Sequence, residues 1–226
     1  MTSDQASENK VVLAIEAAVR GGSISLIENS REIAARCGTD AVSRAEDLLA
    51  NIADLLEQMQ IEKRRIGLIA VSNGPGSYTG IRIGLATALG LARALHIECI
   101  GVPLMPAIAE FHRKEADCII VIPMGRSEFC WQAFKSFDGP NPSDHPLTGA
   151  ADDFLEYSQG LAGYDLLIQH DAFEVVERMP GFNNFKSRAS DCGRDLALSV
   201  GLASRNRVSD LTPNYVRNSQ FSSSPV

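Results

Sequence analysis

Apolar positions along the chain follow two periods, one typical of strands and the other typical of helices. An apolar run over 11–18 and an alternating run over 22–28, joined through Arg20-Gly21-Gly22, predict a β-hairpin. Residues 43–59 predict an amphipathic helix, because their apolar side chains form one stripe: Ala45, Leu48, Leu49, Ile52, Leu55, Leu56 and Met59. The rest of the first half predicts a strand, a helix, a strand and a helix, at 66–72, 78–95, 97–102 and 106–114.

The second half of the chain repeats this order. An apolar run over 117–125 and an alternating run over 127–137 predict a second hairpin. Residues 139–149 contain three prolines and predict a loop. Beyond the loop we expect a helix, a strand and two further helices, at 150–159, 164–170, 171–178 and 187–204.

Both halves therefore open with a hairpin and continue as alternating strands and helices, which predicts an α/β fold with a largely parallel sheet. We expect duplicated units in two lobes, an N-terminal lobe over 11–102 and a C-terminal lobe over 103–217. The polar segments 1–10 and 218–226 are expected to be flexible tails.

Composition and charge limit the kinds of partner and environment expected for this chain. The net charge is −7 and the sequence pI about 5.1, which argues against a chain that grips nucleic acid alone, because such binding depends on Lys and Arg. No apolar run is long enough for a membrane span, and the N-terminus lacks the apolar core of a secretory signal. The five cysteines lack a Cys-x-x-Cys pair, and Cys99, Cys118 and Cys130 lie in apolar runs. We expect these three to be buried apolar side chains in a cytoplasmic protein.

A glycine-rich stretch, VSNGPGSYTGIRIGLATALGLARAL, follows the strand at 66–72. It resembles a phosphate loop, but no lysine follows its second glycine, and the next strand ends without an acid for a ribose. A type II turn followed by a helix N-cap explains the same residues without a ligand. We expect a structural turn made of Gly74, Pro75, Gly76 and Ser77.

The helix at 78–95 has only two charged residues, Arg82 and Arg93, and carries apolar side chains on more than one side. Such a helix is expected to be covered on two sides. The small residues Gly80, Gly84 and Ala88 are spaced by four and could form a groove for another helix. The second cover is either the other lobe of this chain or a separate subunit.

Catalytic and metal-binding patterns do not emerge from the remaining residues. The four histidines, His96, His112, His145 and His170, form no His-x-x-x-His pair. No Gly-x-Ser-x-Gly pattern is present to anchor a catalytic serine. We therefore expect no catalytic residue and no metal ligand.

The runs GPGSYTGIRIGLATALGLARAL and PMGRSEFCWQAF, with the terminal PNYVR, resemble the TsaB (YeaZ) family. This family is the dimerisation subunit of the bacterial machinery that makes threonylcarbamoyladenosine in transfer RNA. The resemblance implies an actin-like, Hsp70-like ATPase architecture and a non-catalytic role. It implies pairing through the N-terminal helices with a TsaD-like catalytic paralogue, on which a small TsaE-like ATPase docks. ATP and metal would then belong to the partner subunits, and transfer RNA would be contacted only through the assembled complex.

The same resemblance places the partner-binding surface on the two helices of the first half. The expected interface residues are Tyr78, Ile81, Arg82, Gly84, Leu85, Ala88, Leu89, Ala92, Leu48, Ile52 and Leu55. An isolated chain with this surface could also form a homodimer. The chain departs from the family at Glu16-Ala17-Ala18, where relatives usually have Asp-Thr-Ser. Two alternatives remain: an ATP- or sugar-phosphate-handling enzyme of the same fold and, with less support, a metallopeptidase-like protein.

Overall fold

The computed structural model describes most of the chain in segments, which are residues 10–19, 21–37, 44–112, 117–124, 128–135, 145–161, 163–169, 176–178, 189–191, 195–206 and 210–216. The elements of the first half are β1 (Val11–Glu16), β2 (Ser23–Glu28), β3 (Arg31–Cys37), α1 (Arg44–Gln58), η1 (Lys63–Arg65), β4 (Ile66–Ser72), α2 (Tyr78–Leu95), β5 (Glu98–Val102) and α3 (Leu104–His112). Those of the second half are β6 (Cys118–Pro123), β7 (Phe129–Phe134), β8 (Leu147–Gly149), α4 (Ala151–Ser158), β9 (Asp165–Ile168), β10 (Ala189–Asp191), α6 (Leu196–Ala203) and η4 (Ser204–Asn206).

The first sheet has the strand order β3-β2-β1-β4-β5. β1 and β2 form the predicted antiparallel hairpin, with Leu13 opposite Leu26, and β3 continues it to the edge. β4 and β5 run parallel to β1 and bring Ala70 beside Ala14. β1 is buried along its whole length because helices cover both faces of this sheet, as its continuous apolar run predicts.

The second sheet repeats the first strand by strand. Its order is β10-β9-β6-β7-β8, with β6, β7 and β8 antiparallel and β9 and β10 parallel to β6. Each sheet therefore consists of a three-stranded antiparallel unit followed by two parallel strands on the other side of its first strand. The predicted duplication is confirmed at the level of sheet topology.

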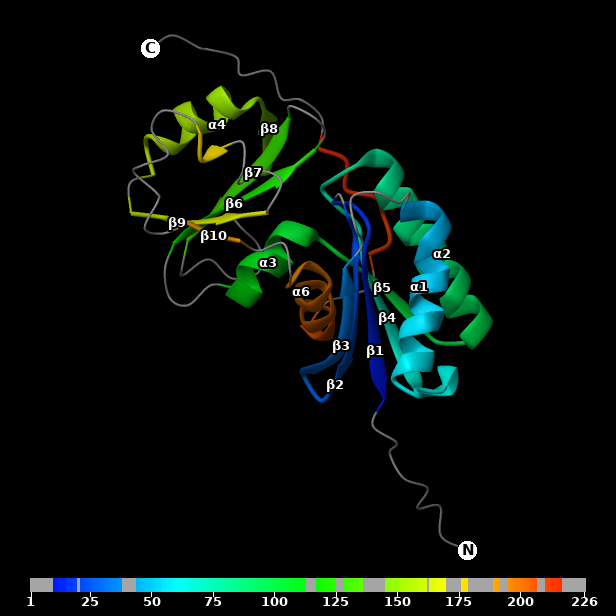
Figure 1. The fold of residues 1–226 in the computed structure, drawn as a ribbon. Coiled ribbons are helices and arrows are strands. Elements are labelled where there is room, and N and C mark those ends of the chain that lie inside the picture. The colour runs from blue at the N-terminus through cyan, green and yellow to red at the C-terminus, as the bar shows by residue number, and fades with distance from the viewer. Residues whose placement is uncertain are drawn as a thin grey trace, which may run out of the picture.

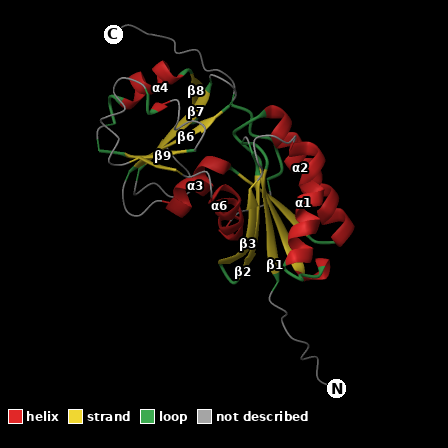
Figure 2. Ribbon diagram, viewed as in Figure 1, coloured by secondary structure: helices red, strands yellow, loops and turns green. Residues whose placement is uncertain are grey.

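Helices separate and flank the two sheets (Figure 2). α1 and α2 cover the outer face of the first sheet, whereas α3 and α6 lie on its other face, between the two sheets (Figure 1). α4 packs on β7 and β8 at the outer face of the second sheet. The packing does not follow the predicted boundary at residue 102, because α6 comes from the second half of the chain and packs on β1, β2 and β4 of the first sheet.

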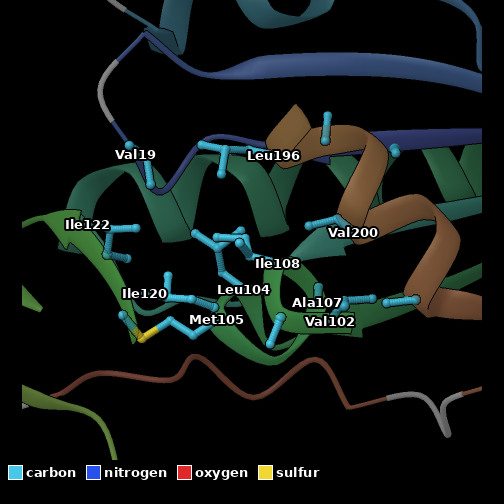
Figure 3. Close-up of a cluster of buried hydrophobic side chains, with 14 of the residues drawn as sticks. Val19, Val102, Leu104, Met105, Ala107, Ile108, Ile120, Ile122, Leu196 and Val200 are labelled. Atoms are coloured by element: carbon cyan, nitrogen blue, oxygen red, sulfur yellow. The ribbon is translucent and has the colours of Figure 1, made fainter. Parts of the chain in front are cut away.

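One apolar cluster joins the two halves. Val19 from the turn after β1 lies near Leu196 of α6, and Leu104 of α3 lies with them (Figure 3). Met105 of α3 reaches the second sheet, where its Sδ lies 3.9 Å from the Sγ of Cys130. The space between the two sheets is therefore filled by buried apolar side chains.

The sequence pattern missed three strands. β3 is an edge strand of mixed exposure, and its charged residues Arg31, Glu32 and Arg36 obscure the alternation. β8 has three residues and lies in the region predicted to be a loop. β10 occupies the start of the helix predicted at 187–204, so that helix begins only at Leu196. Most of the helix predicted at 171–178, and both predicted tails apart from Lys10, lie outside the described residues.

The prediction for the three cysteines is confirmed, because Cys99, Cys118 and Cys130 are buried. Burial raises the pKa of Cys130 to about 12 and, together with nearby Glu98, the pKa of Cys99 to about 11. Cys37 at the end of β3 is exposed. No helix in the described part of the chain has both the length and the apolar character needed to cross a membrane.

We expect iodoacetamide at pH 8 to modify Cys37 in the folded protein while Cys99 and Cys130 remain unmodified. Only the thiolate reacts, and a pKa of about 12 leaves about one Cys130 thiol in ten thousand ionised at that pH. Raising the pH increases the thiolate fraction of Cys99 before that of Cys130. Peptide mass spectrometry after quenching measures the labelling, with urea-unfolded protein as the control. Equal labelling of Cys37 and Cys130 in folded protein would contradict the buried placement.

Candidate functional site

The glycine-rich loop between β4 and α2 follows the carboxyl end of a parallel strand (Figure 1), the edge at which open α/β sheets commonly bind ligands. The Gly74–Pro75 peptide is cis. Gly76 has a φ of 155°, far from the value of about +80° that the second central residue of a type II turn requires, so the predicted type II turn is wrong. The predicted N-cap is confirmed: the Oγ of Ser77 accepts a hydrogen bond from Gly80 N at 3.4 Å.

The polar backbone of this loop is engaged by the chain itself. Ser77 N donates to Ala18 O at 2.7 Å, which ties the start of α2 to the turn after β1. Leu104 N donates to Gly74 O at 2.8 Å and ties the loop to α3. The loop therefore connects three elements of the core.

Two glycines allow a close approach between the loop and the turn after β1. A Cβ on Gly76 would lie 2.5 Å from Ala18 O, and Gly76 has a φ of 155°. A Cβ on Gly80 would overlap Ala17 O. Protein backbone thus fills the space directly beside the glycines, where a phosphate loop would hold its ligand.

Glu16 occupies the backbone donors of the facing turn. Its side chain is buried, and its Oε1 accepts hydrogen bonds from Ala18 N at 2.6 Å and from Val19 N at 2.9 Å. Consecutive backbone N–H groups in a turn are a common anion site. Here the carboxyl group of Glu16 itself accepts from two of them.

A C-terminal segment, residues 210–216, covers the same edge of the sheet, and we call it the strap. The side-chain amide of Asn73 donates to Asp210 O and to Thr212 O, each at 3.2 Å. Asn214 N in turn donates to Asn73 O at 2.7 Å. A Cβ on Gly101 of β5 would overlap Asp210 O, so the strap lies directly against β5.

Sequence reasoning noted this segment only as a family-like ending and assigned it no role. Its contact with Asn73 spans more than half of the chain. The available signal was its composition, since Pro213, Asn214 and Tyr215 favour an extended, hydrogen-bonding segment over a helix. That signal does not reveal which edge the segment covers.

Most of the interface residues predicted on α1 and α2 do not lie on the surface of the described chain. The chain's own sheet and helices bury Ile81, Gly84, Leu85, Ala88, Ala92, Leu48, Ile52 and Leu55. The groove expected from Gly80, Gly84 and Ala88 faces inward, because Gly80 meets Ala17 and Gly84 meets Ala17 and Val71. α2 carries apolar residues on two sides because one side packs on the first sheet and another packs on α1. The second sheet does not cover α2, because it lies on the opposite face of the first sheet (Figure 1).

The side of α2 that remains accessible, which we call the outer face of α2, holds the rest of the predicted interface residues. Tyr78 and Arg82 are exposed and Leu89 is half-buried. Sequence reasoning missed two exposed small residues on this face, Ala86 and Gly90; a Cβ on Gly90 would meet no atom within 4 Å. Arg93 lies near the C-terminal end of the same face.

Tyr78, Arg82 and Tyr215 form one exposed cluster where the strap reaches α2. The Cζ of Arg82 lies 3.8 Å from the centre of the Tyr78 ring, and its Nε donates to the Oη of Tyr215 at 3.1 Å. The two tyrosine rings are 4.8 Å apart and tilted by 35°. The hydrogen bond with Tyr215 raises the pKa of Arg82 above its ordinary value, so the guanidinium is always charged.

The histidines lie apart. His96 ends α2 in the left-handed conformation, and His112 Nε2 lies 3.9 Å from Asp195 Oδ2. His145 is exposed, and His170 is outside the described residues. Within the described segments, no group of three His, Cys, Asp or Glu side chains is placed to bind a metal.

Comparison with known proteins gives one family. A family model described as TsaD, tRNA N6-adenosine threonylcarbamoyltransferase, matches residues 41–162. The tRNA threonylcarbamoyladenosine biosynthesis protein TsaB of Buchnera aphidicola (Baizongia pistaciae) is 28% identical over 137 residues, which are 58% of this chain and 61% of that protein. An uncharacterized protein of Mycobacterium leprae is 31% identical over 129 residues, or 55% of this chain and 35% of that protein. The matches thus span about half the length of these curated relatives.

Solved structures extend the similarity to the fold. YeaZ from Pseudomonas aeruginosa matches with a TM-score of 0.64 and 19% identity, over 92% of this chain and all of that one. The activator of the 2-hydroxyisocaproyl-CoA dehydratase from Clostridium difficile, solved with ADPNP, matches with a TM-score of 0.55 and 7% identity, over 87% and 94% of the two chains. These similarities concern the fold alone, and they confirm the predicted α/β architecture with duplicated units.

Proposed function

The chain belongs to the tRNA N6-adenosine threonylcarbamoyltransferase family and, within it, to the TsaB/YeaZ group, and from this premise we propose that it is a non-catalytic subunit of the machinery that makes threonylcarbamoyladenosine in transfer RNA. Its direct partner is a TsaD-like catalytic paralogue, and a TsaE-like ATPase joins that pair. ATP and metal belong to the partner subunits, and transfer RNA is contacted through the assembled complex. The assembly works in the cytoplasm, away from membranes.

The observation that carries a partner role is the presence of large exposed apolar side chains on neighbouring elements, namely α1, α2 and the strap. In the described part of the chain, such residues include Leu49 on α1, Met59 just beyond it, Tyr78 on α2 and Tyr215 on the strap; a fifth, Phe111, is on α3. α1 and α2 lie side by side on the outer face of the first sheet (Figure 1). Exposed aromatic and aliphatic residues on neighbouring surface elements favour an interface there.

The proposal is tested with a variant on the outer face of α2. Leu85→Asp or Gly84→Arg, which the sequence alone suggests, would disturb the core because both positions are buried. Ala86→Arg places a large charge on an exposed helical position instead. We expect it to remain folded by circular dichroism and to lose co-elution with the TsaD-like paralogue in size-exclusion chromatography.

The matched control is Gln159→Arg, at the exposed end of α4 far from α2 (Figure 1). It adds the same side chain and is expected to leave co-elution unchanged. Depletion of the protein in its source organism, followed by mass analysis of transfer-RNA nucleosides, tests the cellular role. Retention of the threonylcarbamoyl mark after depletion would contradict the proposal.

A nucleotide-handling enzyme is the alternative function, and it is favoured by the position of the glycine loop at the carboxyl edge of the sheet. The hydrogen bonds of the glycine loop argue against nucleotide binding, because Ser77 N and the backbone donors beside Glu16 already have acceptors within the chain. We expect millimolar ATP or ADP with Mg²⁺ to leave the Tm of the isolated chain unchanged. A ligand present at a hundred times its Kd would stabilise the fold by about 2.7 kcal/mol, which a thermal scan resolves. A clear rise in Tm would instead support a nucleotide-handling enzyme.

A further inference from the structure

Arg82 is fixed in place before any partner arrives. The Tyr78 ring packs against its guanidinium, with Cζ 3.8 Å from the ring centre, and Tyr215 Oη accepts a hydrogen bond from Nε at 3.1 Å. The two contacts come from different parts of the chain, α2 and the strap. A flexible arginine loses side-chain freedom when it binds, and a fixed one has less to lose.

The terminal amino groups of Arg82 are available for binding. Apart from its contacts with the two tyrosines, Arg82 has no hydrogen bond and no ion pair within the described part of the chain. Its side chain is exposed on the outer face of α2. A guanidinium presents its donors as a planar fork that matches the two oxygens of a carboxylate.

Charge on α2 indicates where that carboxylate comes from. The chain as a whole is acidic, with 28 acidic and 21 basic residues, yet α2 contains Arg82 and Arg93 and no acidic residue. Two copies of α2 placed against each other would bring together only positive charge, which disfavours that contact. A second α2 therefore supplies no carboxylate for Arg82, and we take the TsaD-like paralogue of the proposed function as its source.

The surroundings of Arg82 favour a protein carboxylate over a nucleic-acid phosphate. Ala86 and Gly90 lie along the same face, and small residues allow the backbone of a partner helix to approach closely. Binding to a nucleic-acid backbone depends on several lysines and arginines acting together. This face has one arginine at each end, and the residues between them include small and apolar side chains.

We propose that Arg82, held by Tyr78 and Tyr215, is an anchor that binds a carboxylate on the partner protein, and that the strap is part of the partner-binding surface. The inference rests on the proposed function, since the partner meant is the TsaD-like paralogue. Tyr215 acts as a positioning residue because it orients Arg82. Tyrosine and arginine are also the side chains that most often dominate binding at interfaces.

The experiment measures the Kd of the full-length chain for the paralogue by calorimetry. We expect Arg82→Gln to raise the Kd about 30-fold, because the paired partner carboxylate loses its charged donor. Tyr215→Phe keeps the ring and removes the hydroxyl acceptor, and we expect a rise of about fivefold. Lys135→Gln is the matched control: it removes one positive charge from an exposed side chain just after β7 of the second sheet, outside the proposed binding face, and should change the Kd by less than about twofold.

Two further readings separate the outcomes. The difference between wild type and Arg82→Gln should shrink at high salt, because an ion pair is screened, whereas a purely structural effect would persist. Equal Kd values for wild type, Arg82→Gln and Lys135→Gln would overturn the anchor and leave the partner role intact. The anchor would also be overturned if Arg82→Gln weakens only the binding of transfer RNA to the preformed complex. That result would mean that the Arg82 guanidinium binds a phosphate. Failure of the wild-type chain to bind the paralogue would overturn the proposed function and the anchor together.

Discussion

Glu16→Ala is expected to lower the free energy of unfolding by about 4 kcal/mol, because the change leaves two buried N–H groups without an acceptor. Oε1 accepts from Ala18 N and from Val19 N, and Glu16 is fully buried at the end of β1. Each buried donor that loses its acceptor costs about 1–3 kcal/mol, and the removed side chain leaves a cavity. The effect combines these losses at the turn that holds the start of α2.

Glu16→Gln is the matched control, since the amide oxygen can still accept both hydrogen bonds. We expect it to retain most of the stability, with a loss of about 1 kcal/mol. Urea unfolding followed by circular dichroism and by fluorescence of Trp131, the single tryptophan, gives both values. If Glu16→Ala is as stable as Glu16→Gln, another group must satisfy the two donors.

The second large effect is a contrast between two glycines of α2. Gly80→Ala is expected to lower the free energy of unfolding by about 2 kcal/mol, because the added methyl group overlaps Ala17 O and backbone cannot move aside cheaply. Gly90→Ala is expected to raise it by about 1 kcal/mol, because alanine has the higher helix propensity and nothing lies within 4 Å of the new atom. The chemical change is identical, so the difference of about 3 kcal/mol reports the environment alone.

Urea unfolding of the isolated chain measures both variants in parallel. A loss of similar size at both positions would contradict the open surroundings of Gly90, and the reverse order would show that α2 presents its other side to the sheet. The result also bears on the predicted interface, because the burial of Gly80 is what places Arg82 and Ala86 on the outer face of α2.

Most helices and central strands were predictable because their apolar periods are long and clear. α2 was expected at 78–95 and is found at Tyr78–Leu95, with Ser77 as its N-cap. β1 and β4 were predicted because strands covered on both faces are apolar throughout. β3 and β8 were missed because edge strands satisfy weaker constraints and carry weaker patterns.

The site was only partly predictable, for a geometric reason. Sequence spacing shows that Ile81, Leu85 and Ala88 share a stripe with Ala92, but a stripe that packs on a sheet and a stripe that packs on a partner look alike. Burial separates them, and it assigns this stripe to the core. The cluster at Arg82 needs Tyr215, whose place beside α2 depends on the whole intervening chain.

By itself the sequence determined the α/β class, the duplicated order of elements and the N-cap that begins α2, because these depend on neighbours close along the chain. Only the tertiary structure decided which side of α2 is accessible, what fills the glycine loop and where residues 210–216 lie. Those outcomes depend on contacts between distant residues, such as Asn73 with Asp210. Local propensity and periodicity carry no information about such pairs, since they are fixed only when the sheets and helices pack together.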